Sequence, residues 1–402
     1  MTTRTFARTF IACCLTLSTL AAADFTWNGS VSSSWQESAN WSPAGVPSAA
    51  DTVTVPGGKK PIDLTNTWQV AAFNLAGGTV QGSGTLTVTS AFAWTAGKLS
   101  GSGRLQIPVG ATLTISGVSS KDLVGWSLEV SGTARWEGTG SISSGQGATV
   151  NVEPTGLFEI SSDQILYFNW GGNATVFNNA GIVRKTAATG TTTFYEVVFN
   201  NSGTLAVQTG TLRLTGGGTG TGLYSVSAGA TLDFGGGTHT LSSASSITGD
   251  GTLNVSGGKV THNGNYQVTG TTKVGNGELH LIGNITSLGS SVAVTGGTLD
   301  VGADVTVQGD GSLSGGTITG TGELVFTGAF TWTGGTLSGT GALIIPANAT
   351  LVIGSASGKT LLSRTVSIAG TARWEGTGSI SSGEGATVNV EPTGLFEISS
   401  DQ

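Results

Sequence analysis

The residues of this chain that could do chemistry do not complete a known catalytic or cofactor-binding motif. The run at 354–360, Gly-Ser-Ala-Ser-Gly-Lys-Thr, resembles a phosphate-binding loop, but its glycines stand one residue too close for that motif. The related run at 116–122 ends in Ser-Lys-Asp and lacks the pattern. We therefore interpret both runs as turns and predict no cofactor.

Three histidines are the candidates for a metal-binding column. His239, His262 and His280 stand about 20 residues apart, a spacing that would stack them in a repetitive fold with turns of that length. Their neighbours differ, which indicates three isolated side chains. We predict no metal site.

Acid pairs that could cleave a glycan are also few. General acid–base work on sugars needs two carboxylates about 5–10 Å apart. Glu137 and Glu153 could meet across turns, but they recur as Glu375 and Glu391, and a duplicated active site is not expected. The G-x-S-x-G and H-E-x-x-H motifs are absent from the sequence. We predict no catalytic residue and keep a polysaccharide lyase or hydrolase as the alternative function.

The chain contains a long internal repeat. Residues 132–164 recur at 370–402 with one difference, Gln146 against Glu384, and looser similarity extends the copies to 72–164 and 310–402. A copied block of this length extends a structure, whereas an enzyme rarely needs its site twice. The second copy stops where the first continues, so we expect the chain to be cut off within a repeat.

A shorter period lies inside the long one and predicts the fold. Gly-Gly-Thr stands at 296–298, 315–317 and 334–336, two steps of 19 residues, and the segments between such turns alternate apolar and polar residues. Alternation with period two is typical of strands with one buried face. We predict an all-β parallel β-helix, or β-solenoid, with turns of about 19–22 residues and about 19 turns. Right-handed winding follows from the general preference for parallel crossovers.

Paired asparagines recur with a 22-residue step. A shared Val-Phe-Asn-Asn run would place Asn178 over Asn200 and Asn179 over Asn201 on adjacent turns. Stacked side-chain amides can bond to each other in a ladder. We predict a structural ladder, with a polar binding row as the less favoured alternative. Ice binding is a second alternative function, but pairs such as Thr85 and Thr87 do not recur at the turn spacing.

The N-terminal region divides into a signal peptide and a cap. Residues 1–23 combine a positively charged start, an apolar stretch that includes both cysteines, and small residues before a cleavage point between Ala23 and Asp24. We assign 24–70 to a Trp-rich cap and 71–402 to the β-solenoid. The cap tryptophans Trp27, Trp35 and Trp41 are expected to cover the first turn, with a sugar-stacking platform as the alternative.

Composition limits the partners. Charged residues make up 10% of the chain and the net charge is −7, without a basic patch. This balance argues against nucleic acid and against anionic lipid as partners. After the signal peptide, no stretch is apolar enough to predict a transmembrane segment.

Several segments resemble a known group of proteins. The opening run at 25–55, the Val-Phe-Asn-Asn segments and the run at 334–353 are similar to bacterial autotransporter passengers and large surface adhesins with β-helix repeats. The resemblance implies export to the bacterial cell surface or the medium. Similar passengers include adhesins, enzymes and proteins of unknown role. Among these roles we expect a stalk or adhesin that contacts an unknown surface or glycan ligand. An outer-membrane translocator or a sorting tail would then lie beyond residue 402.

Overall fold

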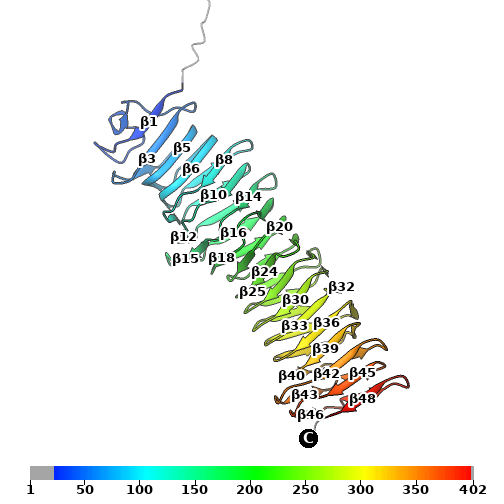
Figure 1. Ribbon diagram of the computed structural model, residues 1–402. Coiled ribbons are helices and arrows are strands. Elements are labelled where there is room, and N and C mark those ends of the chain that lie inside the picture. The colour runs from blue at the N-terminus through cyan, green and yellow to red at the C-terminus, as the bar shows by residue number, and fades with distance from the viewer. Residues whose placement is uncertain (1–21, 400–402) are drawn as a thin grey trace, which may run out of the picture.

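The computed structural model describes residues 22–399, which form a long rod (Figure 1). The rod is an all-β parallel β-solenoid of about 17 turns, so the predicted fold class is confirmed. The predicted number of about 19 turns is wrong because several turns are longer than expected. Thr149, for example, pairs with Val176, 27 residues later. With about 4.8 Å per turn, 17 turns span about 80 Å.

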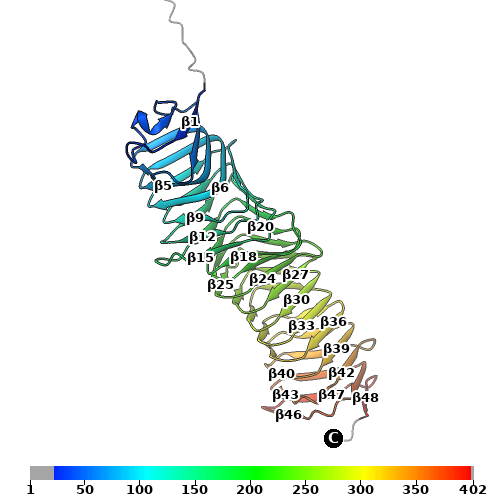
Figure 2. The same cartoon turned by 60° about the vertical axis from the view of Figure 1, so that its left-hand side comes forward.

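Three faces enclose the rod, and each complete turn contributes one strand to each face (Figure 2). A strand pairs in parallel with the strand three places later in the chain, as β10 does with β13. Before the regular turns, β5 (Thr67–Gly82) and β6 (Thr85–Gly101) each run through a whole turn and pair side by side. Successive turns therefore pair in parallel in the same way from β5 to the last strand.

The strands of the regular turns are grouped here by face. The first face contains β7 (Arg104–Ile107), β10 (Ser127–Val130), β13 (Thr149–Val152), β16 (Val176–Asn179), β19 (Val198–Asn201), β22 (Gly218–Gly220), β25 (Thr238–Leu241), β28 (Lys259–His262), β31 (Glu278–Leu281), β34 (Thr298–Val301), β37 (Thr317–Thr319), β40 (Gly335–Leu337), β43 (Lys359–Leu362) and β46 (Ile380–Gly383). The second face contains β8 (Thr112–Ile115), β11 (Thr133–Trp136), β14 (Leu157–Ile160), β17 (Ile182–Lys185), β20 (Thr204–Val207), β23 (Leu223–Val226), β26 (Ser246–Gly249), β29 (Asn265–Val268), β32 (Asn284–Leu288), β35 (Val305–Val307), β38 (Leu324–Phe326), β41 (Ala342–Ile345), β44 (Thr365–Ile368) and β47 (Thr387–Val390). The third face contains β9 (Lys121–Val124), β12 (Ile142–Gly145), β15 (Ile165–Phe168), β18 (Thr191–Tyr195), β21 (Thr211–Leu214), β24 (Thr231–Phe234), β27 (Thr252–Val255), β30 (Thr271–Val274), β33 (Ser291–Val294), β36 (Asp310–Leu313), β39 (Ala329–Trp332), β42 (Thr350–Ile353), β45 (Thr371–Trp374) and β48 (Leu395–Ile398).

Alternation within these short strands produces the core. In β8 the side chains of Leu113 and Ile115 are buried, whereas those of Thr112 and Thr114 lie outward. Parallel pairing stacks the inward side chains of one turn on those of the next, so a single core runs along the rod. Burial of each Leu, Ile or Val stabilises the fold by about 1.5–3 kcal/mol.

The two copies of the long repeat occupy different faces. In the first copy β9 lies on the third face and β11 on the second, whereas their counterparts β43 and β45 lie on the first and third. The 238-residue offset between the copies thus corresponds to eleven turns and one further strand. Relative to the faces of the rod, the second copy is turned by one face.

The N-terminal end is closed by aromatic side chains. This region contains β1 (Asp24–Trp27), the short 3-10 helix η1 (Ser38–Asn40), β2 (Trp41–Ser42), β3 (Thr52–Pro56) and β4 (Ile62–Leu64). Trp27, Trp35 and Trp41 are no more than 2% exposed, and the Trp41 ring lies edge-on to the other two at 4.8 Å between centroids. Parallel pairing already begins where β1 meets β3, inside the range 24–70 assigned to the cap.

The predicted cleavage point lies at the start of β1, while residues 1–21 of the predicted signal peptide are outside the described residues. The backbone N–H of Ala23 donates to Oδ1 of Asp51 at 2.8 Å, and its carbonyl accepts from the N–H of Thr52 at 2.9 Å. Ala23 and Asp24 are therefore both in contact with the first turn.

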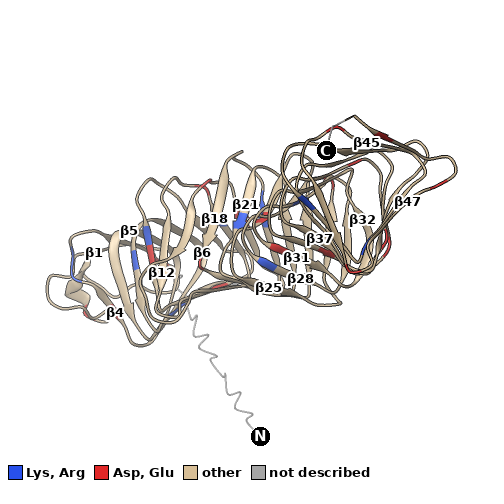
Figure 3. Cartoon of the chain, turned by 90° about the horizontal axis from the view of Figure 1, so that it is seen from below, with Lys and Arg blue, Asp and Glu red and all other residues tan. Residues whose placement is uncertain are grey.

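Charged residues are sparse over the rod and of both signs (Figure 3). Within residues 22–399, none of the helices has the length and apolar character needed to cross a membrane.

Candidate functional site

The four predicted ladder asparagines form two rows that point in opposite directions. Asn179 and Asn201 point inward, are 1% exposed, and are joined by a 2.7 Å bond from Nδ2 of Asn179 to Oδ1 of Asn201. Asn178 and Asn200 point outward on the first face, and Nδ2 of Asn200 donates to Oδ1 of Asn178 at 3.0 Å. The first row is buried within the core, and the second lies at the surface.

The outward row continues over neighbouring turns. Nδ2 of Asn178 donates to Oδ1 of Asn151 at 2.8 Å, and Oγ1 of Thr219 donates to Oδ1 of Asn200 at 3.1 Å. A shallow groove of about 190 Å³ follows the row past Asn178, Asn200 and Thr219. Hydrogen bonds between turns hold these side chains in fixed rotamers, which lowers the entropic cost of binding a partner.

The three histidines do not share a column. Parallel register places His239 beside Val260 and His262 beside Leu281, so no histidine lies over another. Within the described part of the chain no group of three or more His, Cys, Asp or Glu side chains is arranged so that it could hold a metal ion.

The histidines also differ in protonation. His239 and His262 point into the core, and burial lowers the pKa of each to about 4. His280 points outward between the carboxylates of Glu278 and Asp300, each 3.0 Å away. Partial burial opposes protonation there, but the two hydrogen bonds outweigh it and raise the pKa of His280 above its usual value.

The acids singled out in the sequence are separated by the fold. Glu137 directly follows β11 on the second face, whereas Glu153 follows β13 on the first. Glu153 instead shares an outer groove of about 270 Å³ with Glu129, whose carboxylate receives bonds from Arg104 and Gln106 at 3.0 and 3.1 Å. The groove offers a polar surface in which one of the two acids is already paired.

The phosphate-loop-like run does not present its lysine to solvent. Lys359 starts β43, is 2% exposed, and donates from Nζ to the carbonyl of Ser357 at 2.9 Å. Its counterpart Lys121 donates to Ser119 in the same way at 2.8 Å. Both lysines close a corner from the inside and cannot reach a bound phosphate outside the rod.

An exposed aromatic group on the third face was not predicted from the sequence. Tyr195 is 48% exposed, Trp170 is 42% exposed, and Tyr167 points outward one turn before Tyr195. Ile165 is 41% exposed beside them and lines a groove of about 420 Å³ with Tyr195 and Arg213. We call Tyr167, Trp170 and Tyr195 the aromatic row. Its sequence signal was the Asn-Trp-Gly-Gly-Asn run, which places a large aromatic residue within a turn.

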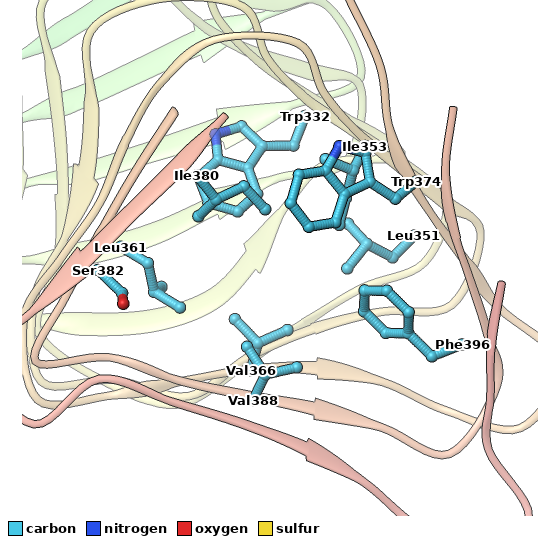
Figure 4. A pocket seen from close by; sticks show the side chains of 10 residues that line it. All are labelled: Trp332, Leu351, Ile353, Leu361, Val366, Trp374, Ile380, Ser382, Val388 and Phe396. Carbon is cyan, nitrogen blue, oxygen red and sulfur yellow. The ribbon is translucent and has the colours of Figure 1, made fainter. Parts of the chain in front are cut away.

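A second apolar surface lies where the core reaches the C-terminal end of the described chain. An open cavity of about 260 Å³ is lined by inward side chains of the second copy, among them Trp332, Trp374 and Phe396 (Figure 4). The side chains converge from all three faces, as they do in every turn of the core.

Comparison with known proteins gives one match, over the N-terminal quarter of the chain. A family model described as "Domain of unknown function (DUF8693)" matches residues 26–121, which span the tryptophan cluster and the first turns of the solenoid. None of the curated proteins and none of the solved structures matches the chain.

Proposed function

We propose that the chain is the β-solenoid body of an exported bacterial surface protein and acts as a structural stalk or adhesin rather than as an enzyme. The observation that carries this proposal is the single core through about 17 turns. In such a fold each turn contacts only its neighbours, so further turns add length without changing the rest. Length is the property that a stalk needs.

Support for a contact role comes from the outer faces. The outward asparagine row on the first face is bonded from turn to turn, and the aromatic row on the third face carries rings into solvent. Polar groups held in fixed positions and exposed aromatic side chains are each typical of surfaces that bind partners.

Support for export comes from the sequence. The positively charged start and apolar stretch of residues 1–23 have the form of a signal peptide, and the repeats resemble those of surface-displayed proteins.

Surface display can be tested by labelling intact cells. An epitope inserted beside Val118, which is 83% exposed at the corner between β8 and β9, should not disturb the core. In the bacterium that carries the gene, antibody should label intact cells or the medium. Label that appears only after the cells are lysed would overturn export.

The non-catalytic role has its own test. Incubation of the purified chain with a panel of acidic and neutral polysaccharides should release neither reducing nor unsaturated ends above a heat-denatured control. Release that depends on the folded chain would favour the lyase or hydrolase alternative.

A further inference from the structure

The two copies of residues 132–164 differ at a single position, and in the first copy this residue, Gln146, contacts the turn that carries Trp170 of the aromatic row. Residues 132–164 and 370–402 differ only at Gln146 and Glu384, and both of these residues have a φ of 56°. At this position the backbone is therefore left-handed in both copies, and the difference lies in what each side chain can bond. Gln carries a donor, whereas an ionised Glu only accepts.

Gln146 uses that donor to hold the turn that carries Trp170. Its Nε2 donates to the carbonyl of Trp170 at 2.9 Å, and its backbone N–H donates to the carbonyl of Gly171 at 2.7 Å. Glu384 instead accepts a 2.9 Å bond from Oγ of Ser363. A carboxylate at position 146 could not make the bond to Trp170, because both groups would be acceptors.

Two glycines let the turn after Trp170 approach Gln146 closely. Gly171 and Gly172 have φ values of 64° and 75°, a region that favours glycine, and a Cβ on Gly172 would come within 2.7 Å of Oε1 of Gln146. Trp170 lies back over earlier turns of the third face. Its ring centroid is 3.6 Å from Nζ of Lys98, and its Nε1 donates to Oδ1 of Asp122 at 3.3 Å.

These contacts align the aromatic row with the rod axis. Lys98, Asp122, Ser143, Tyr167 and Tyr195 occupy the same register position on five successive turns of the third face. The Trp170 ring lies at the first two positions, and the tyrosines occupy the last two. At about 4.8 Å per turn the row extends over about 19 Å.

The cations around the row already have partners, and the carboxylates of Asp122 and Glu196 also lie beside it. Lys98 lies against the Trp170 ring, and Nε of Arg213 is 3.4 Å from Oδ2 of Asp233. A ligand that bound through its own negative charges would have to break these contacts. An uncharged ligand would keep them and could use the aromatic faces together with the hydroxyl groups of the two tyrosines.

We infer that the aromatic row of Trp170, Tyr167 and Tyr195 binds an extended, uncharged polysaccharide that runs along the third face parallel to the rod axis. The apolar faces of sugar rings pack on aromatic rings, and sugar hydroxyls bond to the flanking polar groups. The distance of about 4.8 Å between turns is similar to the advance of one sugar in an extended chain. The biological use of this site rests on the proposed adhesin role, but the binding itself can be measured on the purified chain.

The test is calorimetric titration with oligosaccharides of defined length. Cellohexaose, chitohexaose and mannohexaose serve as uncharged ligands, and hexagalacturonate serves as the acidic one. At least one uncharged hexasaccharide should bind at least about tenfold more tightly than its disaccharide, because the disaccharide reaches only part of the row. Trp170→Ala should weaken that binding by about tenfold or more.

The duplicated block supplies a matched pair of variants. Gln146→Glu should weaken binding in the same direction as Trp170→Ala, whereas Glu384→Gln should leave it unchanged. Circular dichroism and thermal melting check that each variant folds, and the fold already accommodates Glu at the equivalent position 384.

Three results would overturn the inference. These are no binding of any uncharged hexasaccharide, binding of hexagalacturonate alone, and binding that neither Trp170→Ala nor Gln146→Glu weakens. Each would leave the proposed surface display intact, because cell labelling tests display separately.

Discussion

Residues 132–164 and 370–402, the nearly identical parts of the two copies, have the same inward side chains but different exposure. Val150 is 3% exposed and its counterpart Val388 is 50% exposed, while Ile160 and Ile398 are 0% and 64% exposed. The residues and their local strands are the same, so the copy's own sequence does not decide whether they are buried.

What differs is the next turn. In the first copy Phe177 pairs over Val150 and Val183 pairs over Phe158, so β16 and β17 cover the inward side chains. Over the second copy the described residues contain no later turn, and the same positions line the open cavity of Figure 4. A turn of this solenoid is therefore stabilised mainly by its neighbours.

The largest expected difference between the copies comes from removing one ring. Phe158→Ala should destabilise the turns around β14 by about 3–5 kcal/mol, because Phe158 is 1% exposed and its removal leaves a cavity. Phe396→Ala should cost less than about 1.5 kcal/mol, because that ring is only partly covered. Hydrogen exchange of β14 and β48 measures both. Equal losses would show that burial is not set by the neighbouring turn.

Low pH should destabilise the region between the two copies more than it destabilises either copy. His239 and His262 are no more than 2% exposed and have pKa values of about 4 against 6.5 when unfolded, whereas neither copy contains histidine. A lowered pKa in a base means that stability is fully present above pH 6.5 and is lost as the pH falls toward 4. Each histidine accounts for about 3 kcal/mol over that range.

Hydrogen exchange at pH 7 and pH 4.5 would show this loss at β25 and β28 before either copy. His262→Leu should remove about half of it, because neither ring nitrogen of His262 has a hydrogen-bond partner among the described residues. A uniform loss of protection along the rod would contradict the assignment to these histidines.

Extending the chain past Gln402 with a second copy of residues 165–207 would give the second copy of the repeat the same following turns as the first. The added turns should cover Val388 and Phe396 as β16 and β17 cover their counterparts. Amides of β46–β48 should then exchange at least about tenfold more slowly, which is about 1.4 kcal/mol. The control is the same extension with Ser at the positions copied from Leu166, Phe177 and Val183; equal protection from it would mean that apolar cover is not the cause.

The smallest difference is expected at the surface. Arg135 lies 3.9 Å from Glu159 in the first copy, and Arg373 lies 3.1 Å from Glu397 in the second, with both arginines more than half exposed. Exposed ion pairs contribute about 0.2–1 kcal/mol. Arg135→Ala and Arg373→Ala should each change stability by no more than about 0.5 kcal/mol, an effect that 0.5 M salt should abolish in urea titrations. A loss above about 2 kcal/mol in one copy alone would show that the surface also distinguishes them.

The sequence predicts the fold well because alternation and glycine spacing are local properties. The segment around β8 reads as a half-buried strand from Thr112 to Ile115 without knowledge of any other turn. The turn count depends on corner lengths, which is why several long turns, such as those before Ser127, Val176 and Lys359, made the predicted number too high.

The aromatic row could not be predicted in this way. Trp170 and Lys98 are 72 residues apart, and their contact depends on the exact length of three turns. The single difference between the copies, Gln146 against Glu384, was visible in the sequence. Its meaning required the bond from Gln146 to the carbonyl of Trp170.

The shift of one face between the copies has a consequence for any filament that repeats this block. Because the offset is eleven turns and one strand, the residues of each new copy lie on the next face of the rod, one third of the way around the axis. A fourth copy would return to the face of the first. The same outward side chains would then follow a helical path around such a filament, so that a partner approaching from any side would meet them.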